Sequence, residues 1–599
     1  MTALAPAPQT GAQTIAEAPA APARRRRPWL VPALLVLAAG VTWLIAAPTL
    51  RDAPWSMFGL LTAASPLLAV SIGLAATGFG LAIALRAPRM AAIGLIATVL
   101  VVRLPMTIGV EAPSYSWTYK HFGVVDYIER YGSVDQSVDI YHNWPAAFAF
   151  VAWLNSVTGT DTMSVALWFP VVVQLAMAGA VYYLCRSQRL SVSASLVGAF
   201  LAHAANWVAQ DYMSPQAIAF TLGIVVIALL LSSPRSPAAA WVAVPIFAAI
   251  VVAHQLTPYW IIAATVALTV LRRIRPRYLV FVLIAIALGY MALHLGVLTR
   301  FGSLLNLDLL ANLQTSAQRA SGDPSIGQRV NSIAARAVSV VVCGGAAAIV
   351  AWRLWRRRDE WRATLTLATI AFSPVLILVG QGYGGEAIFR VFMYSLPGCA
   401  LIIAPALTAL LQAARPVRAA LRRRIAATAA LTVLTLVSAQ AYYGGWFANL
   451  VTTESVDVAT RILKEEDPHT LTIGVAPGAP GRLVAEYTEF VHAHESFDTG
   501  IDTWLNTWME GDDFSDPTRM NEMTQALLGG GQESIILITR QMQYYNDYYG
   551  TLPPGALDNF LDIIADDPRW TLEYESDDIL MYRLDSGFSQ GIAPGGDGG

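Results

Sequence analysis

The sequence predicts a mostly α-helical, polytopic membrane protein with a small extracytoplasmic α/β domain at its C-terminal end. Of the 599 residues, 55% are hydrophobic and only 13% are charged, and the mean hydropathy is +0.50. A soluble protein of ordinary composition carries about 25% charged residues. Apolar stretches of about 20 residues, long enough to cross a bilayer as helices, recur as far as residue 445, after which the chain becomes polar and acidic.

The N-terminal segment 1–28 is rich in Ala, Pro and Thr and is predicted to be disordered in the cytoplasm. It ends on a basic cluster, Arg24–Arg27, followed by an apolar run over 29–50. This run could be a cleaved signal peptide, but it is longer than the usual hydrophobic core of one. We therefore favour a retained signal anchor.

Hydropathy predicts about thirteen spans within residues 29–445. They fall near residues 29–50, 58–85, 90–110, 164–185, 191–209, 216–232, 238–254, 259–271, 278–297, 332–352, 363–380, 387–412 and 425–445.

The basic residues of the connecting loops orient these spans. They lie at Arg86/Arg89, Arg186/Arg189, Arg235, 272–277, 353–358 and 415–424. Counting the spans places every cluster on the same side as the basic N-terminal segment, and the positive-inside rule makes that side the cytoplasm. We therefore expect a multi-pass plasma-membrane protein with loops 111–163, 210–216, 254–258, 298–331 and 380–386, and the chain after 446, outside.

The C-terminal domain is expected over 446–585, followed by a disordered Gly-rich tail over 586–599. Its pattern predicts helices over 454–466 and 555–567, strands over 471–477 and 534–540, and a closing hairpin of 570–576 with 578–584. The three cysteines, Cys185, Cys343 and Cys399, lie in or beside apolar runs, so the polar parts have no disulfide framework and no cysteine-based metal site.

The external loop 111–163 carries the most unusual chemistry. Glu111 follows the third span directly and precedes a cluster that includes Tyr115, Lys120 and His121. Two turns earlier, inside the span, stands Arg103. An intramembrane arginine is costly and usually faces a polar cavity or an anionic group. Arg103 is therefore expected either to bind a phosphate or to pair with a carboxylate, and Glu111 either caps the span or acts on a substrate.

Two stretches of this loop, 122–132 and 144–158, are predicted to be short helices that lie in the interface. Between them stand Asp139 and His142. This pair could transfer a proton, bind a metal or hydrogen-bond a ligand. One His and one Asp are a weak metal signal, so we favour ligand binding and assign no metal site.

Shorter external turns add further candidates. Asp211 precedes a helix that begins at Pro215 and can simply cap it, and His254 stands at another helix end. In the glycine-rich segment 380–394, Glu386 and Arg390 are spaced i, i+4. They either form a salt bridge that caps the span or contact a substrate, and an arginine fork at the interface suits a lipid-linked phosphate.

This layout resembles the GT-C superfamily of membrane glycosyltransferases, which take a sugar from a polyprenyl-phosphate carrier and transfer it on the outer face. The family hallmark is a large first external loop with an acidic residue just after a span and two interfacial helices, matched here by Glu111, 122–132 and 144–158. Many members also have a C-terminal external domain. Members often carry an Asp or an acidic pair where this chain has one Glu, and commonly have fewer spans before the loop. The segments 139–145 and 206–217 also resemble actinobacterial membrane proteins.

The resemblance implies an inverting transfer to a cell-envelope glycan or protein. An acceptor hydroxyl would lose its proton to a carboxylate, foremost Glu111, with Asp139 and His142 as further catalytic candidates. Binding of the lipid-linked sugar would fall to Arg103, Lys120, Asp211, His254, Glu386 and Arg390. A divalent metal ion is compatible with such a mechanism, but no ligands can be assigned to it. The expected partners are membrane lipid, the lipid-linked sugar and the acceptor, and no nucleic acid.

Two other classes stay open. A transporter or flippase of lipid-linked glycans needs polar residues spread along several spans, whereas here they gather at one face. A non-catalytic envelope assembly protein would use its acidic domain to bind a partner and would not need Glu111 or Arg390.

Overall fold

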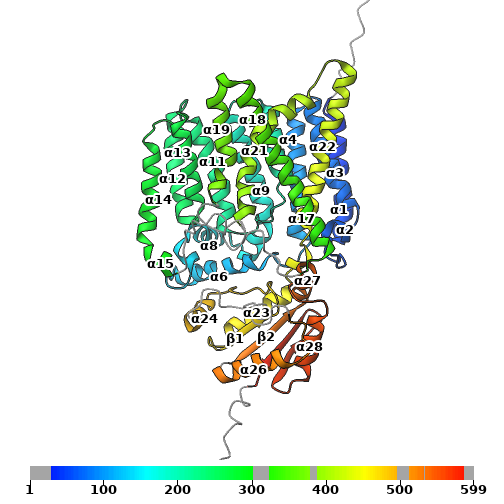
Figure 1. The fold of residues 1–599 in the computed structure, drawn as a ribbon, viewed down its shortest axis with the longest axis vertical. Coiled ribbons are helices and arrows are strands. Elements are labelled where there is room, and N and C mark those ends of the chain that lie inside the picture. Colours follow the sequence, from blue (N-terminus) through cyan, green and yellow to red (C-terminus); the bar gives the residue numbers. More distant parts are fainter. Residues whose placement is uncertain (1–27, 301–322, 378–386, 495–511, 532, 586–599) are drawn as a thin grey trace, which may run out of the picture.

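A computed structural model describes residues 28–300, 323–377, 387–494, 512–531 and 533–585. A bundle of long helices forms the larger part, and a smaller α/β layer packs against one end of it (Figure 1). The predicted disordered tail 586–599 and loop 380–386 lie outside the described residues, as does the N-terminal segment apart from Pro28.

The bundle confirms a polytopic helical membrane protein. Among the described residues, eight helical segments are long and apolar enough to cross a membrane. They are built from α1 (Leu30–Ala46) with η1 (Ala47–Thr49), α3 (Leu67–Ala84), α4 (Pro88–Arg103) with α5 (Pro105–Ile108), α9 (Thr162–Ser187), α11 (Pro215–Ser232), α17 (Ile326–Ser339) with η2 (Val340–Gly344) and α18 (Gly345–Arg356), α21 (Ala387–Leu411), and α22 (Val417–Tyr443).

The remaining predicted spans correspond to shorter helices. These are α10 (Val192–Ala204), α12 (Pro237–Ala253), α13 (Thr257–Val270), α14 (Leu279–Leu293) followed by α15 (Leu295–Arg300), and α19 (Trp361–Phe372) between η3 (Arg358–Glu360) and η4 (Ser373–Leu376). Each predicted span thus contains a helix.

Several predicted spans differ in extent from the helices; the one expected over 425–445, for example, begins at Val417. The one expected over 58–85 is split into α2 (Leu60–Ala63) and α3, because Pro66 interrupts the helical hydrogen bonding. The one expected over 191–209 ends at Ala204, and the chain then runs without helix to Ser214. This unwound segment, residues 205–214, enters the candidate site.

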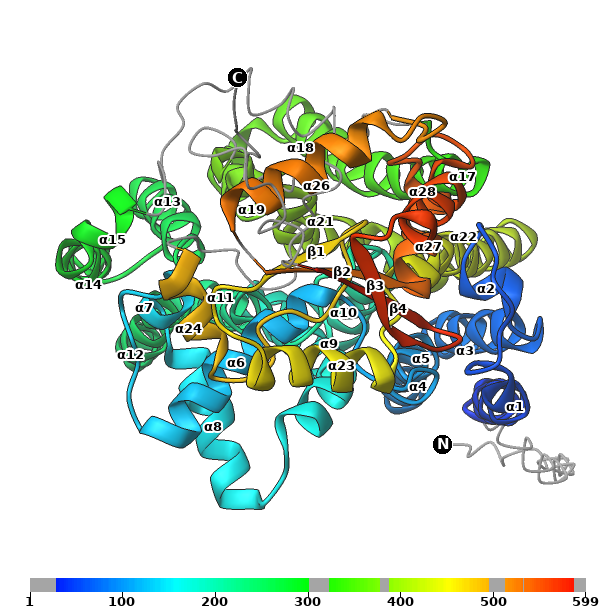
Figure 2. The same cartoon turned by 90° about the horizontal axis from the view of Figure 1, so that it is seen from below.

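The external loop contributes α6 (Ser116–Tyr131), α7 (Ile140–Asn143) and α8 (Ala146–Thr158). Helix α8 agrees with the prediction, and α6 begins six residues before the predicted 122, at Ser116. Helix α6 lies between the bundle and the α/β layer (Figure 1), whereas α8 projects past the edge of the bundle in the view from below (Figure 2). Its exposed side chains include Phe150, Trp153 and Val157.

The C-terminal region, residues 446–585, contains a four-stranded sheet of order β1-β2-β4-β3. Strand β1 (Leu471–Gly474) pairs parallel with β2 (Ser534–Thr539), and β4 (Ile579–Leu584) pairs antiparallel with both β2 and β3 (Trp570–Glu575). The predicted strands and hairpin are confirmed, although β1 ends before 477. The helices are η6 (Phe447–Asn449), α23 (Thr453–Glu465), α24 (Tyr487–His494), α26 (Thr518–Gly530), α27 (Arg540–Tyr549) and α28 (Ala556–Asp566).

The external loop and the C-terminal region share one apolar cluster. Tyr119 and Phe122 of α6 pack there with Ala459 and Leu463 of α23 and with Phe490 of α24. Burial of these side chains fixes the two segments to each other. Both therefore lie at the same end of the bundle, as the span count requires, while their orientation in the cell stays a prediction.

Candidate functional site

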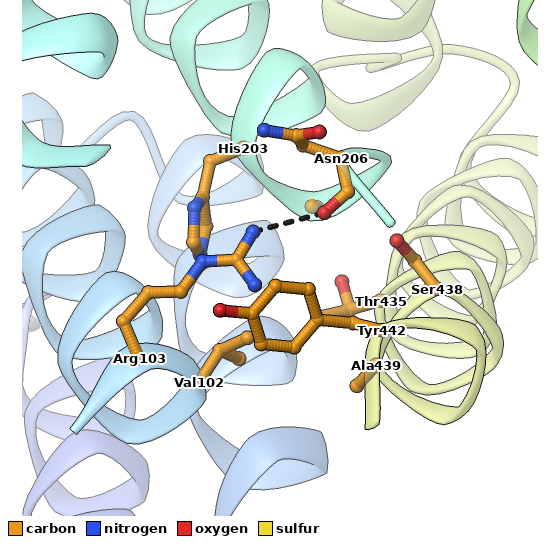
Figure 3. A pocket seen from close by; sticks show the side chains of 9 residues that line it. Val102, Arg103, His203, Asn206, Thr435, Ser438, Ala439 and Tyr442 are labelled. Carbon is orange, nitrogen blue, oxygen red and sulfur yellow. Dashed lines mark hydrogen bonds between the residues drawn. The ribbon is translucent and has the colours of Figure 1, made fainter. Parts of the chain in front are cut away.

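A buried ion pair stands where α4 ends. Arg103 is fully buried, and its Nε lies 3.1 Å from Oδ2 of Asp211. Its Nη2 donates to the carbonyl of Asn206 at 2.9 Å, and the guanidinium carbon lies 3.7 Å from the centre of the Tyr442 ring. Figure 3 shows the guanidinium between the Asn206 carbonyl and the Tyr442 ring. Arg103 therefore ties the unwound segment 205–214 to α4 and α22.

The carboxylate of Asp211 has further donors. Gln174 of α9 donates to Oδ2 at 3.0 Å, and the hydroxyl of Tyr442 donates to Oδ1 at 3.1 Å. A buried charge is tolerated when it is paired and hydrogen-bonded in this way. The sequence left open whether Arg103 binds a phosphate or pairs with a carboxylate. The contact with Asp211 is the second of these. We call Arg103, Asp211, Gln174, Asn206 and Tyr442 the buried centre.

Narrow cavities flank the buried centre on two sides. The first is lined by Arg103, His203, Asn206, Thr435, Ser438 and Tyr442, among others (Figure 3). Within the described residues, Arg103 Nη1 and Asn206 Oδ1 are buried without a hydrogen-bond partner. The second cavity is lined by Gln174, Gln210, Asp211, Thr221 and Met393, among others. Both gaps are too narrow to hold more than about one water molecule, so these two unpaired atoms belong to a closed site.

Aromatic residues of the external loop cover this end of the bundle. Tyr115 has a left-handed backbone, with φ at 73°, which is unfavourable for a non-glycine residue. Its ring lies 5.7 Å from that of Tyr212, which stacks on His121 at 6.0 Å. The backbone N–H of Tyr115 donates to the carbonyl of Asn449. Such strain persists where the surroundings fix it, often at functional sites.

His121 is held in one tautomer. Its Nδ1 lies 2.7 Å from the carbonyl oxygen of Met213, which can only accept, so the ring proton sits on Nδ1 and Nε2 keeps its lone pair. Burial lowers the pKa of His121 to about 4, so the imidazole is neutral at pH 7. The sequence grouped His121 with Lys120 but did not select it, because its contact with segment 205–214 is not visible in the local pattern.

His254 and Arg390 form a second group nearby. Nδ1 of His254 accepts from the backbone N–H of Thr257 at 3.2 Å, so the ring proton is on Nε2. Arg390 is buried in the first turn of α21, and both it and His121 lie within electrostatic range of His254. Glu386 lies outside the described residues. Lys120 is half-buried, with its ammonium 4.0 Å from the centre of the Trp117 ring.

Glu111 is exposed at the start of the external loop. Its Oε2 accepts from the backbone N–H of Thr453 at 3.2 Å, in the first turn of α23. A carboxylate at a helix N-terminus is favourable because the orphan N–H groups and the helix dipole attract negative charge. Neither of the two cavities is lined by Glu111 or by Arg390.

Asp139 and His142 face the C-terminal region. Oδ1 of Asp139 caps α7 by accepting from the backbone N–H groups of Tyr141 and His142. Its Oδ2 accepts from the Tyr487 hydroxyl at 2.9 Å and from Arg482 at 3.2 Å. Tyr487 and Arg482 were missed by sequence reasoning because they lie more than 340 residues away in the chain.

Among the described residues, no group of three or more His, Cys, Asp or Glu side chains is arranged to hold a metal ion.

No family model matches this sequence, and no curated protein matches it. The solved structures that align with most of the chain include two of ArnT from Cupriavidus metallidurans. The structure bound to undecaprenyl phosphate is 12% identical and has a TM-score of 0.43, with 82% of this chain and 97% of that chain covered. The apo structure is 13% identical and has a TM-score of 0.41, with 83% and 98% covered. At such scores the likeness assigns no activity to this chain.

Proposed function

We propose that this protein is a membrane glycosyltransferase that moves a sugar from a polyprenyl-phosphate carrier to an acceptor at the outer face. The observation that carries the proposal is the concentration of charged and hydrogen-bonding side chains at one end of an otherwise apolar bundle. They come from different elements and comprise Arg103, His121, Gln174, Asp211, His254, Arg390 and Tyr442. A transporter would instead require polar groups along several spans.

The carrier phosphate is assigned to Arg390, His254 and Lys120. Arg390 brings a guanidinium and His254 an Nε2–H donor to one neighbourhood. Donors fixed in place stabilise the charge that develops on a departing phosphate, and an arginine fork suits its oxygens. In this proposal, this end of the bundle meets the lipid headgroups.

The proton of the acceptor hydroxyl is assigned to Glu111. One of its oxygens, Oε2, accepts from Thr453, and its side chain is open to solvent. Asp211 is the rival base, but its carboxylate already pairs with Arg103 and accepts hydrogen bonds from Gln174 and Tyr442. In this proposal Asp211 and Arg103 hold segment 205–214 in place and Glu111 takes the proton as the hydroxyl attacks the anomeric carbon.

The test is release of free carrier from a panel of polyprenyl-phosphate sugars by the detergent-purified protein. Glu111→Gln should lower turnover by about two to four orders of magnitude with carrier affinity little changed, because the amide cannot accept the proton. Arg390→Ala should also weaken carrier affinity. Glu489→Gln, an equivalent change of an exposed carboxylate on α24, is the control. Full turnover in both Glu111→Gln and Arg390→Ala would contradict the mechanism, and carrier movement without cleavage would favour a flippase.

Action at the outer face requires the C-terminal region to be outside the cell. Ser534 at the start of β2 is fully buried, so the exposed Glu522 on α26 is the better position for a reporter cysteine. Glu522→Cys should react with an impermeant thiol reagent in intact cells whose outer envelope admits it. Reaction only after lysis would reverse the orientation.

A further inference from the structure

The hydroxyl of Tyr487 bridges two side chains of the external turn 139–145. It lies 2.9 Å from Oδ2 of Asp139 and 2.9 Å from Nε2 of His142, and all three side chains are buried. Nδ1 of His142 accepts from the backbone N–H of Asp135, so the ring proton is on Nε2. Nε2–H therefore donates to the tyrosine oxygen, and the tyrosine O–H donates to Asp139.

Arg482 reinforces this bridge from the same segment of the C-terminal region. Its side chain is buried and pairs with Asp139 at 3.2 Å. Its backbone is left-handed, with φ at 60°, and its carbonyl accepts from the backbone N–H of Gly123 at 2.9 Å. A non-glycine residue keeps such a conformation only where its surroundings determine it.

Helix α6 is shaped to receive this segment. A Cβ at Gly123 would lie 2.3 Å from the Arg482 carbonyl oxygen and 2.6 Å from the Tyr487 ring, so no larger residue fits. One turn later, Asp126 accepts from the backbone N–H of Ala485 at 2.7 Å. Close backbone approach and matched hydrogen bonds indicate a specific, well-packed contact between α6 and the segment that contains Arg482 and Tyr487.

The bridged turn continues towards the buried centre. Tyr141, which follows Asp139 by two residues, packs edge-on against His121 at 5.1 Å. His121 in turn holds the carbonyl of Met213, two residues after Asp211. Direct contacts thus run from Tyr487 through the turn and His121 to segment 205–214.

We propose that Tyr487 and Arg482 are positioning residues, through which the C-terminal region sets the arrangement of turn 139–145, His121 and segment 205–214. The C-terminal region is then an integral part of the site rather than a separate binding module. The positioning itself can be tested without a substrate, and only its consequence for turnover rests on the proposed function.

The variant Tyr487→Phe removes the bridging hydroxyl and leaves buried groups of Asp139 and His142 short of a partner. Hydrogen–deuterium exchange of the full-length protein in detergent should then rise several-fold in peptides covering 139–145 and also in those covering 205–214. Arg130→Gln is the matched control, because it breaks a half-exposed ion pair to Glu486 in the same contact. His142→Gln, which keeps one acceptor and one donor, should stay near the wild-type pattern.

Faster exchange in 139–145 with no change in 205–214 would overturn the proposal, since the contact would then be local. An equal response to Arg130→Gln would also overturn it. With an active donor in hand, Tyr487→Phe should lower kcat more than it raises KM for the carrier, because the phosphate contacts are untouched. If exchange rises in both 139–145 and 205–214 but no donor is turned over, the positioning role holds and the proposed glycosyl transfer fails.

Discussion

Two parts of the molecule contain the same cluster of an arginine, an aspartate and a tyrosine, in different surroundings. In the buried centre, Arg103 pairs with Asp211 at 3.1 Å and Tyr442 donates to that carboxylate. At the contact of the external turn with the C-terminal region, Arg482 pairs with Asp139 at 3.2 Å and Tyr487 donates to it. In both, the guanidinium also lies over the tyrosine ring, at 3.7 Å and 5.6 Å from its centre.

The two clusters differ in what the carboxylate and its surroundings still offer. Oδ1 of Asp139 accepts from two backbone N–H groups of α7, and Oδ2 pairs with Arg482, which is distant in the chain. The Asp211 carboxylate accepts hydrogen bonds from the side chains of Gln174 and Tyr442. The buried centre also borders two narrow gaps, and Arg103 and Asn206 line one of them. The cluster at Asp139 therefore joins segments distant in the chain. The buried centre instead holds segment 205–214 against α4, α9 and α22, and within the described residues it leaves Arg103 Nη1 and Asn206 Oδ1 without a hydrogen-bond partner.

The largest expected effect is loss of the charge balance in the buried centre. Arg103→Leu leaves Asp211 buried without its cation and should destabilise the protein by about 3–5 kcal/mol, measured by unfolding in detergent. The double variant Arg103→Leu/Asp211→Leu removes both charges, and should recover most of that stability. If the double variant also recovered turnover, the buried centre would be as purely architectural as the contact at Tyr487.

Much of the fold could be predicted because the physics of its elements is local. Apolar runs long enough to span a bilayer identify the helices of the bundle, and short strand-like runs identify the strands β1, β2, β3 and β4. The unwound segment 205–214 was missed at its start, because the residues from Ala204 to Val208 remain largely apolar. It leaves the helix where its polar groups find partners on α4, α9 and α22, which no local window contains.

Individual residues of the candidate site could be predicted, but which of them contact one another could not. Arg103 and Asp211 could be selected because charge in or beside a span is costly, yet their contact depends on how α4 meets segment 205–214. Asp139 and His142 were selected as a pair, and they do share one partner. That partner, Tyr487, stands in a polar helix of the C-terminal region with no motif to indicate it.

The next largest effect concerns pH at the contact of the external turn. Burial lowers the pKa of His142 below its ordinary 6.5, so the imidazole is neutral in the docked state. The undocked state then binds more protons below about pH 6.5, and docking should weaken progressively as pH falls below that value. Protonated Nδ1 would face the N–H of Asp135, donor against donor. Exchange of the peptide 483–494, followed from pH 7.5 to 5.5, measures the effect.

Other charged groups lie near the His142 ring, and their contribution to the pH dependence must be distinguished from that of His142. Asp139, Asp135 and Arg482 surround His142, and the exposed His492 bonds Oδ2 of Asp135 at 3.2 Å. The dependence should persist in His492→Gln and disappear in His142→Gln. The reverse result would assign the pH response to the outer histidine.

The smallest expected effect is at the rim of the same contact. Arg130 on α6 pairs with Glu486 at 2.7 Å and with Asp126 at 2.9 Å, but its side chain is 37% exposed. Solvent and salt screen such pairs, so Arg130→Gln should change the free energy of unfolding by only about 0.2–1 kcal/mol, and less at high ionic strength. Tyr487 follows Glu486 directly in the chain but is buried, so Tyr487→Phe should change the free energy of unfolding by more and with little dependence on salt. Equal effects of the two variants, or a strong salt dependence in Tyr487→Phe, would mean that the contact is held by its charged rim rather than by the buried bridge.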